Sequence, residues 1–229
     1  PSDALPPDML NERFEKLLRI RQNGEQLLTV SPGEIIGVFD TMQDVGRNFQ
    51  DYLYKTAKVN HLRFESHAGR DLLPHTGADA VYIPADSAEL LLETLPIGDN
   101  LILPARSRTA SPSGLISRTM RRYLADDFFQ LAGIPGNPKN VLTLSYAHRK
   151  LLSIYRWALA RPALLLLESP DAGLDGNARN QLQRYLSQLS QEGIVILVTE
   201  HSFPVLQTQC DHILLFEDGE NLTIHHRAR

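Results

Sequence analysis

The feature that most constrains the fold is the stretch LLLLESPDAGLD, which occupies residues 164–175. Its four leucines end abruptly in a carboxylate, Glu168, and a turn containing Gly173 follows. Because Pro162 and Pro170 bracket the leucines, the run is too short for a helix and is typical of a strand buried on both faces of a parallel sheet. Functional groups in such sheets lie just past the carboxyl ends of the strands, which is where Glu168 stands. A core strand followed by an ordinary turn is the alternative.

Other short apolar runs alternate with helical patterns along the chain. The predicted buried strands are 35–39, 80–84, 164–167, 194–198 and 212–216. Amphipathic helices are expected at 146–160 and 177–191, and Asn23-Gly24 between two apolar segments predicts a hairpin. Strands that alternate with helices indicate an α/β protein with a mostly parallel core sheet. His225-His226 near the end is interpreted as a solvated tail rather than a metal site.

Composition narrows the class of protein. A chain of 229 residues can bury a substantial core, and a net charge of −4 argues against a nucleic-acid partner. The single cysteine, Cys210, suits a reducing compartment and precedes an apolar run, so we expect a buried structural thiol. No apolar run approaches about 20 residues, the length that spans a membrane. Residues 1–10 are predicted to be a leader or linker of a domain cut from a longer protein.

Three stretches together carry a resemblance to a known family. Leu144-Ser145, the segment 168–175 and His201 occur in the order found in the nucleotide-binding domains of ABC transporter ATPases. His201 also lies ten residues before Asp211, the family's usual interval. The Gly46-Arg47 pair and Arg156-Trp157 most resemble the second ATPase domain of the sugar-import branch. The resemblance covers about residues 18–220 and implies an ABC-type ATPase fold. That fold has an N-terminal antiparallel β region and a helical subdomain, expected at about 97–160 of a single domain, 11–229.

The resemblance places a phosphate-binding loop at residues 41–48. Such a loop needs glycines whose backbone N–H groups wrap the phosphates, a cation, and a Ser or Thr for Mg²⁺. Gly46 and Arg47 match, but Thr41 and Asp44 replace glycines and Asn48 replaces the magnesium hydroxyl. A carboxylate near a phosphate repels it. An ordinary strand-to-helix loop that binds nothing is therefore favoured, with weak ATP and Mg²⁺ binding as the alternative.

The resemblance places the catalytic carboxylates at 168 and 169. Glu168 occupies the Walker B position, where the family has Asp, and Ser169 replaces the family's general base, a Glu. A serine cannot accept a proton from water at neutral pH without an activating partner. The sequence therefore argues against efficient ATP hydrolysis.

The remaining motifs are altered to different degrees. In the signature, Ser145 is kept, but Tyr146 and Ala147 stand where the family has glycines. Gly173 and Asp175 match the loop that contacts a second ATPase domain, although the turn alone could require them. His201 is a candidate switch histidine, and a structural histidine at a strand end is the alternative.

The resemblance implies a degenerate nucleotide-binding domain of a sugar importer, weakly active or inactive as an ATPase. Its expected partners are a second ABC ATPase domain and integral membrane permease subunits. Its expected location is the cytoplasm, at the inner face of the membrane. The alternatives left open are a scaffold or regulatory protein that reuses the fold without nucleotide, and a functioning ATPase with unusual ligands.

Overall fold

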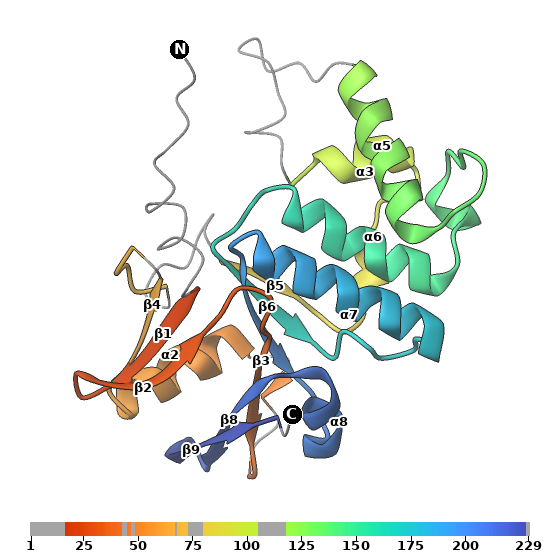
Figure 1. Cartoon of the computed structure of the whole chain (residues 1–229). Helices are drawn as coiled ribbons and strands as arrows, with labels where there is room; N and C mark the ends of the chain where they lie inside the picture. The colour runs from red at the N-terminus through yellow and green to blue at the C-terminus, as the bar shows by residue number, and fades with distance from the viewer. Residues whose placement is uncertain are drawn as a thin grey trace, which may run out of the picture. The chain divides into compact units, whose positions relative to one another are not determined.

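The structure of the chain is a computed structural model. It describes residues 17–42, 45–46, 49–66, 68–72, 80–104 and 118–227 (Figure 1). The chain divides into two compact units. The sheet unit comprises 1–84, 163–170 and 183–229, and the helical unit comprises 85–162 and 171–182. The predicted subdomain range, 97–160, falls within the helical unit, and the domain boundaries themselves stay a prediction.

A six-stranded sheet forms the centre of the sheet unit. Its strand order is β5-β6-β7-β3-β8-β9, and every neighbouring pair is parallel except β8 and β9 (Figure 1). The strands are β3 (Ile36–Asp40), β5 (Ala80–Ile83), β6 (Leu164–Glu168), β7 (Val195–Thr199), β8 (His212–Glu217) and β9 (Glu220–His226). All five residues of β6 are buried, as expected of a strand covered on both faces. The α/β class and the five predicted core strands are therefore confirmed.

A second, antiparallel sheet confirms the N-terminal prediction. It contains β1 (Leu18–Gln22), β2 (Glu25–Val30) and β4 (Leu62–Ser66) in the order β2-β1-β4. Asn23 and Gly24 both have positive φ, 50° and 86°, as a two-residue hairpin turn of type I′ requires. The part of the first apolar segment that precedes residue 17 lies outside the described residues.

The end of the chain differs from its prediction. His225 and His226 do not form a tail, because they end strand β9, which pairs with β8. His226 lies opposite His212 in this pairing, with their Nδ1 atoms 3.0 Å apart. The other ring nitrogen of His212 lies 3.1 Å from Glu34 Oε2. The interpretation as a tail was wrong because an edge strand can consist largely of polar residues. Only a weak alternation of apolar and polar residues distinguishes such a strand from a tail.

One hydrophobic core joins both sheets to helix α2 (Phe49–Val59) within the sheet unit. Ile20, Phe49 and Leu197 of this core are fully buried. Helix α8 (Phe203–Gln209) packs against β3, and Cys210 after it is buried, as predicted. None of the helices in the described part of the chain is both long and apolar enough to cross a bilayer.

The helical unit is built on α3 (Ile97–Ile102), α5 (Arg118–Ala132) and α6 (Tyr146–Ala158), with short 3-10 helices at 87–90 and 141–143. Leu101, Phe128 and Leu152 fill its core. Asn100 is also fully buried, and its amide bonds the backbone of Leu92 in both directions. That pairing removes the cost of burying a polar group in a packed core. Helix α7 (Gly176–Gln191) begins in this unit and continues into the sheet unit.

A buried carboxylate fixes the end of β3 to helix α2. Asp40 is only 3% exposed and accepts hydrogen bonds from the Tyr52 hydroxyl (2.5 Å), Gly219 N (2.8 Å) and Met42 N (2.8 Å). Burial, and then the hydrogen bond to Asp40, raise the pKa of Tyr52 above its usual value. The Asp40 carboxylate and the Tyr52 hydroxyl therefore have a structural role, because they fix the backbone where the β3–α2 loop begins.

We predict that Tyr52→Phe destabilises the protein by about 1–3 kcal/mol, the usual cost of losing a hydrogen bond to a buried charged group. Because the folded pKa of Tyr52 is raised, its contribution is fully present below about pH 10 and is lost as the pH rises further. Urea unfolding of both proteins from pH 7 to 11 should therefore show the difference shrinking above pH 10. Tyr54→Phe, on the same helix but 47% exposed, is the matched control and should change nothing.

Candidate functional site

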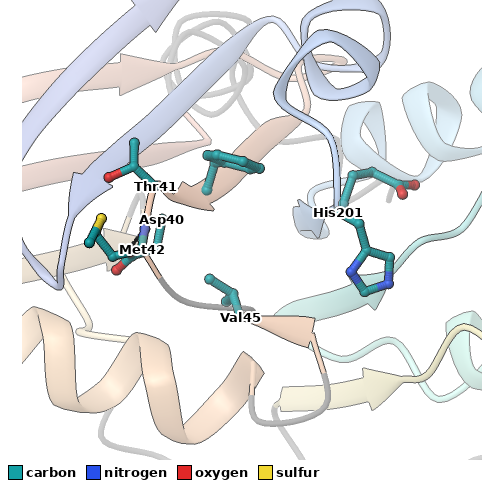
Figure 2. A pocket seen from close by; sticks show the side chains of 7 residues that line it. Asp40, Thr41, Met42, Val45 and His201 are labelled. Atoms are coloured by element: carbon teal, nitrogen blue, oxygen red, sulfur yellow. Dashed lines mark hydrogen bonds between the residues drawn. The ribbon is translucent and has the colours of Figure 1, made fainter.

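A pocket of about 320 Å³ lies in the sheet unit, where β3 and β7 end (Figure 2). Its walls are Phe39, Asp40, Thr41, Met42, Val45, Glu200 and His201. Figure 2 shows Thr41 and Met42 on one side and His201 on the other. The carboxyl ends of parallel strands are the usual place for ligands in open α/β sheets. The structure thus brings together two of the predicted site residues, Thr41 and His201. Gly46 comes directly after the lining residue Val45 in the sequence. Asp44, Arg47 and Asn48 lie outside the described residues.

The described walls of this pocket include two acidic residues. Asp40 and Glu200 contribute carboxyl groups, and none of the described lining residues is Lys or Arg. Neither acid was predicted as a site residue from the sequence. Asp40 could have been noticed because it directly ends an apolar strand, and Glu200 because it directly precedes His201.

Glu168 ends strand β6, and Ser169 directly after it has a constrained geometry. Glu168 is 7% exposed, and its Oε2 accepts a hydrogen bond from the Tyr82 hydroxyl of β5. Ser169 is 3% exposed with a φ of 39°, and its backbone N–H donates to Thr199 O at 2.9 Å. A positive φ is unfavourable for a residue with a side chain and marks a backbone position fixed by its surroundings. The position after Glu168 therefore holds a buried hydroxyl and no carboxylate.

The signature and the contact loop meet inside the helical unit. Ser145 caps helix α6, because its Oγ accepts from His148 N at 3.2 Å. The ring of the next residue, Tyr146, covers Gly173, and Ala147 is half-buried. A Cβ on Gly173 would lie 2.9 Å from Tyr146 Cε1, and the φ of Gly173 is 76°. Glycine is thus favoured at this position for two reasons: the backbone has a positive φ, and the Tyr146 ring leaves no space for a Cβ.

The loop 171–175 is held by three further contacts. Asp175 caps α7 by accepting from Ala178 N at 2.8 Å. Asp171 is 5% exposed and lies 3.0 Å from Arg179 Nε. Lys150 on α6 is 1% exposed, and its Nζ donates to Ala172 O at 2.9 Å. Lys150 was not predicted from the sequence, where its only signal was a cation on the otherwise apolar face of an amphipathic helix.

The arrangement of the two sheets and the helices is the ABC-type ATPase fold. A nucleotide-free ATP-binding cassette from an ABC transporter superposes with a TM-score of 0.63 at 16% identity, covering 93% of this chain and 92% of that one. A dimeric ATP-binding cassette bound to ADP and Pi gives a TM-score of 0.60 at 14% identity, with 94% and 98% covered. No protein-family model matches the chain.

Sequence comparison places the chain among relatives of sugar-import ATP-binding proteins. A ribose import ATP-binding protein of Rhizobium johnstonii is 29% identical over 146 residues, covering 62% of this chain and 28% of the relative. A protein of Yersinia pestis with the same description is 26% identical over 201 residues, covering 84% and 39%. A putative ribose/galactose/methyl galactoside import ATP-binding protein of Pseudomonas syringae pv. tomato is 22% identical, covering 86% and 38%.

The chain is thus related in sequence to sugar-import ATP-binding proteins and has the fold of ABC ATPase cassettes. The chain spans less than half the length of the curated relatives that it matches.

We predict that Gly173→Ala destabilises the protein by about 1–3 kcal/mol, because a Cβ there is strained by the positive φ and by the Tyr146 ring. Tyr146→Ala removes the ring but not the backbone strain. A double-mutant cycle measured by urea unfolding should therefore give a coupling energy of about 1 kcal/mol. Additive effects of the two substitutions would mean that the ring does not press on Gly173. Gly133→Ala, with a similar φ of 65° and open space around it, is the control for strain alone.

Proposed function

We propose that this chain is a degenerate ATPase domain of a sugar importer, weak or inactive in hydrolysis, that acts by pairing with an active ABC ATPase domain. Through that partner it would be joined to membrane permease subunits at the inner face of the membrane. The sugar-import relatives and the cassette fold support this class of function. The resemblance of Gly46-Arg47 and Arg156-Trp157 to the second domain of fused importers supports a place beside another ATPase domain.

The observation that carries the proposal is Ser169. It directly follows Glu168 at the end of β6, where the resembled family has its general base. The Ser169 side chain is buried, and its backbone N–H donates a hydrogen bond to the Thr199 carbonyl. These two constraints hold the loop in place, so a different loop orientation would not bring another residue to this position. Without a proton acceptor near the attacking water, general base catalysis, typically worth a factor of about 10²–10⁴, is lost.

Electrostatics supports weak nucleotide binding as well. Asp44 in the loop would repel a phosphate charge at about 4 Å by roughly 4 kcal/mol at an effective dielectric of 20. Asp40 and Glu200 add acidic groups to the described pocket wall. Bound Mg²⁺ would offset part of this repulsion. Glu168 could contribute to holding Mg²⁺, although its Oε2 already accepts a hydrogen bond from Tyr82. ATP with Mg²⁺ is therefore proposed as a weak ligand at most.

The contact loop supports pairing. Gly173 and Asp175 match the family's domain-contact loop, and Tyr146, 37% exposed, presents an aromatic ring beside it. Exposed tyrosines are enriched among residues that dominate protein interfaces. The active partner domain would meet this face.

A scaffold that binds another protein without nucleotide is the second candidate, and one observation favours it. Ser145 and Asp175 each cap a helix, so both have structural roles that need neither nucleotide nor a partner domain. Retention of these residues is thus explained by folding alone. The two candidates differ in which surface binds the partner.

We predict that calorimetry detects little or no Mg-ATP binding to the native chain and that Asp44→Gly strengthens binding at least about tenfold by removing repulsion and freeing the backbone. Asp44→Asn separates charge from backbone freedom, and Asp51→Asn on the exposed side of α2 is the matched control. Ser169→Glu alone should not restore turnover. A native dissociation constant of about a micromolar, or turnover of about 1 s⁻¹ or faster, would contradict the proposal.

We predict that Tyr146→Ala weakens association with the importer's active ATPase domain at least about tenfold, since truncating a central interface tyrosine commonly costs more than about 1 kcal/mol. Analytical ultracentrifugation of the two purified components measures this. Tyr123→Ala, 65% exposed on α5 of the same unit, is the control and should bind like the native chain.

Asp175→Asn tests the same face without unfolding it. A charge reversal at Asp175 would also remove the cap of α7, which typically costs about 1 kcal/mol, so its effect on binding would be mixed with a loss of stability. Asparagine keeps a capping oxygen and removes only the charge. If Tyr146→Ala and Asp175→Asn both keep full partner binding, the pairing proposal fails and the scaffold candidate is preferred.

A further inference from the structure

The helical unit contains a second pocket, larger than the one at the strand ends. Its volume is about 730 Å³, within the range of roughly 300–1,000 Å³ typical of small-molecule sites. Three segments form it: the start of α3, one face of α5 and the segment 137–139. Its apolar lining residues include Ile97, Phe129 and Pro138.

Gly98 sets the geometry of this pocket. A Cβ at Gly98 would lie 3.3 Å from the carbonyl oxygen of Arg121, so glycine lets α3 approach the backbone of α5 closely. This approach places Asp99 at 2.7 Å from Arg121 Nη1. Arg121 is therefore held in the pocket wall by a partner on the neighbouring helix.

The charges around the pocket do not cancel. Arg118, Arg121, Arg122 and Lys139 line it together with only two acids, Asp99 and Asp126. Asp99 pairs with Arg121, and Asp126 lies 3.8 Å from Arg122. Four cations minus two anions leave a net charge of +2. Within the described part of the chain, Arg118 and Lys139 form no ion pair.

We propose that this pocket binds a small amphipathic organic anion, one with an apolar body and a carboxylate, sulfonate or phosphate group. The apolar body would lie against Phe129 and Pro138, and the anionic group would face Arg118 and Lys139. An apolar wall with a few convergent polar groups is the usual composition of a small-ligand site. Segment 105–117, which precedes α5 in the sequence, contains Arg106 and Arg108 and no acidic residue. The site lies within the helical unit and is independent of nucleotide binding and pairing.

The test compares two fluorescent probes that differ in charge. 8-Anilinonaphthalene-1-sulfonate carries one sulfonate, and N-phenyl-1-naphthylamine has the same aromatic body without it. Titrated into the native chain, the sulfonate should bind one saturable site and more tightly than the neutral probe. The double variant Arg118→Gln/Lys139→Gln should weaken binding of the sulfonate about tenfold and leave the neutral probe within about twofold, since only the charge interaction is removed.

Two further variants locate the site and control for charge. Ala125→Phe adds a ring on the pocket face of α5 and should reduce binding of both probes. Lys55→Gln/Lys58→Gln, which removes the same charge from exposed positions on α2, should change neither. Circular dichroism and thermal unfolding verify that each variant is folded. The proposal is overturned if binding of the sulfonate does not saturate or if Ala125→Phe leaves binding intact. It is also overturned if Arg118→Gln/Lys139→Gln and Lys55→Gln/Lys58→Gln change sulfonate binding equally.

Discussion

The complete burial of β6 is the constraint on which the rest of the sheet unit depends. Because both faces of this strand are covered, its register with β5 and β7 is fixed, and Glu168 lies opposite Thr199. That register brings the Tyr82 hydroxyl to Glu168 and the Ser169 N–H to the Thr199 carbonyl. The residues at the functional edge of the sheet are therefore positioned by hydrophobic packing, which does not depend on what those residues do chemically.

The motif residues that survive in this chain have structural roles that can be identified one by one. Ser145 and Asp175 satisfy the unpaired N–H groups at the starts of α6 and α7, and Gly173 accommodates a positive φ under an aromatic ring. Position 169, where the resemblance implies a general-base carboxylate, holds a serine. The proposed loss of catalysis is therefore compatible with an intact fold, since each of these positions is constrained by a different interaction.

The sequence predicted the strongly patterned elements and missed those with weak patterns. The five core strands and the long helices carry unbroken apolar periodicity, so their positions could be read directly. Strands β4 and β9 were missed because their alternation is diluted by charged and polar residues on exposed faces. At the site, Thr41 and His201 were found through their order along the chain. Asp40 and Glu200 had only weak signals, their places at the end of an apolar strand and directly before His201. The contacts of Asp40 and Lys150 could not be predicted, since their partners, Gly219 and Ala172, are distant in sequence.

The altered positions also bear on what pairing could achieve. In the resembled family, each composite site combines the phosphate loop of one domain with the signature of the other. This chain is altered in both, at Asp44 and at Tyr146, whose ring fills the space over Gly173. A partner's nucleotide would then meet an aromatic ring where glycine backbone N–H groups approach the phosphate in the family. Pairing through this face would therefore contribute contact area and orientation to the partner, while the partner's own residues would supply the catalytic groups.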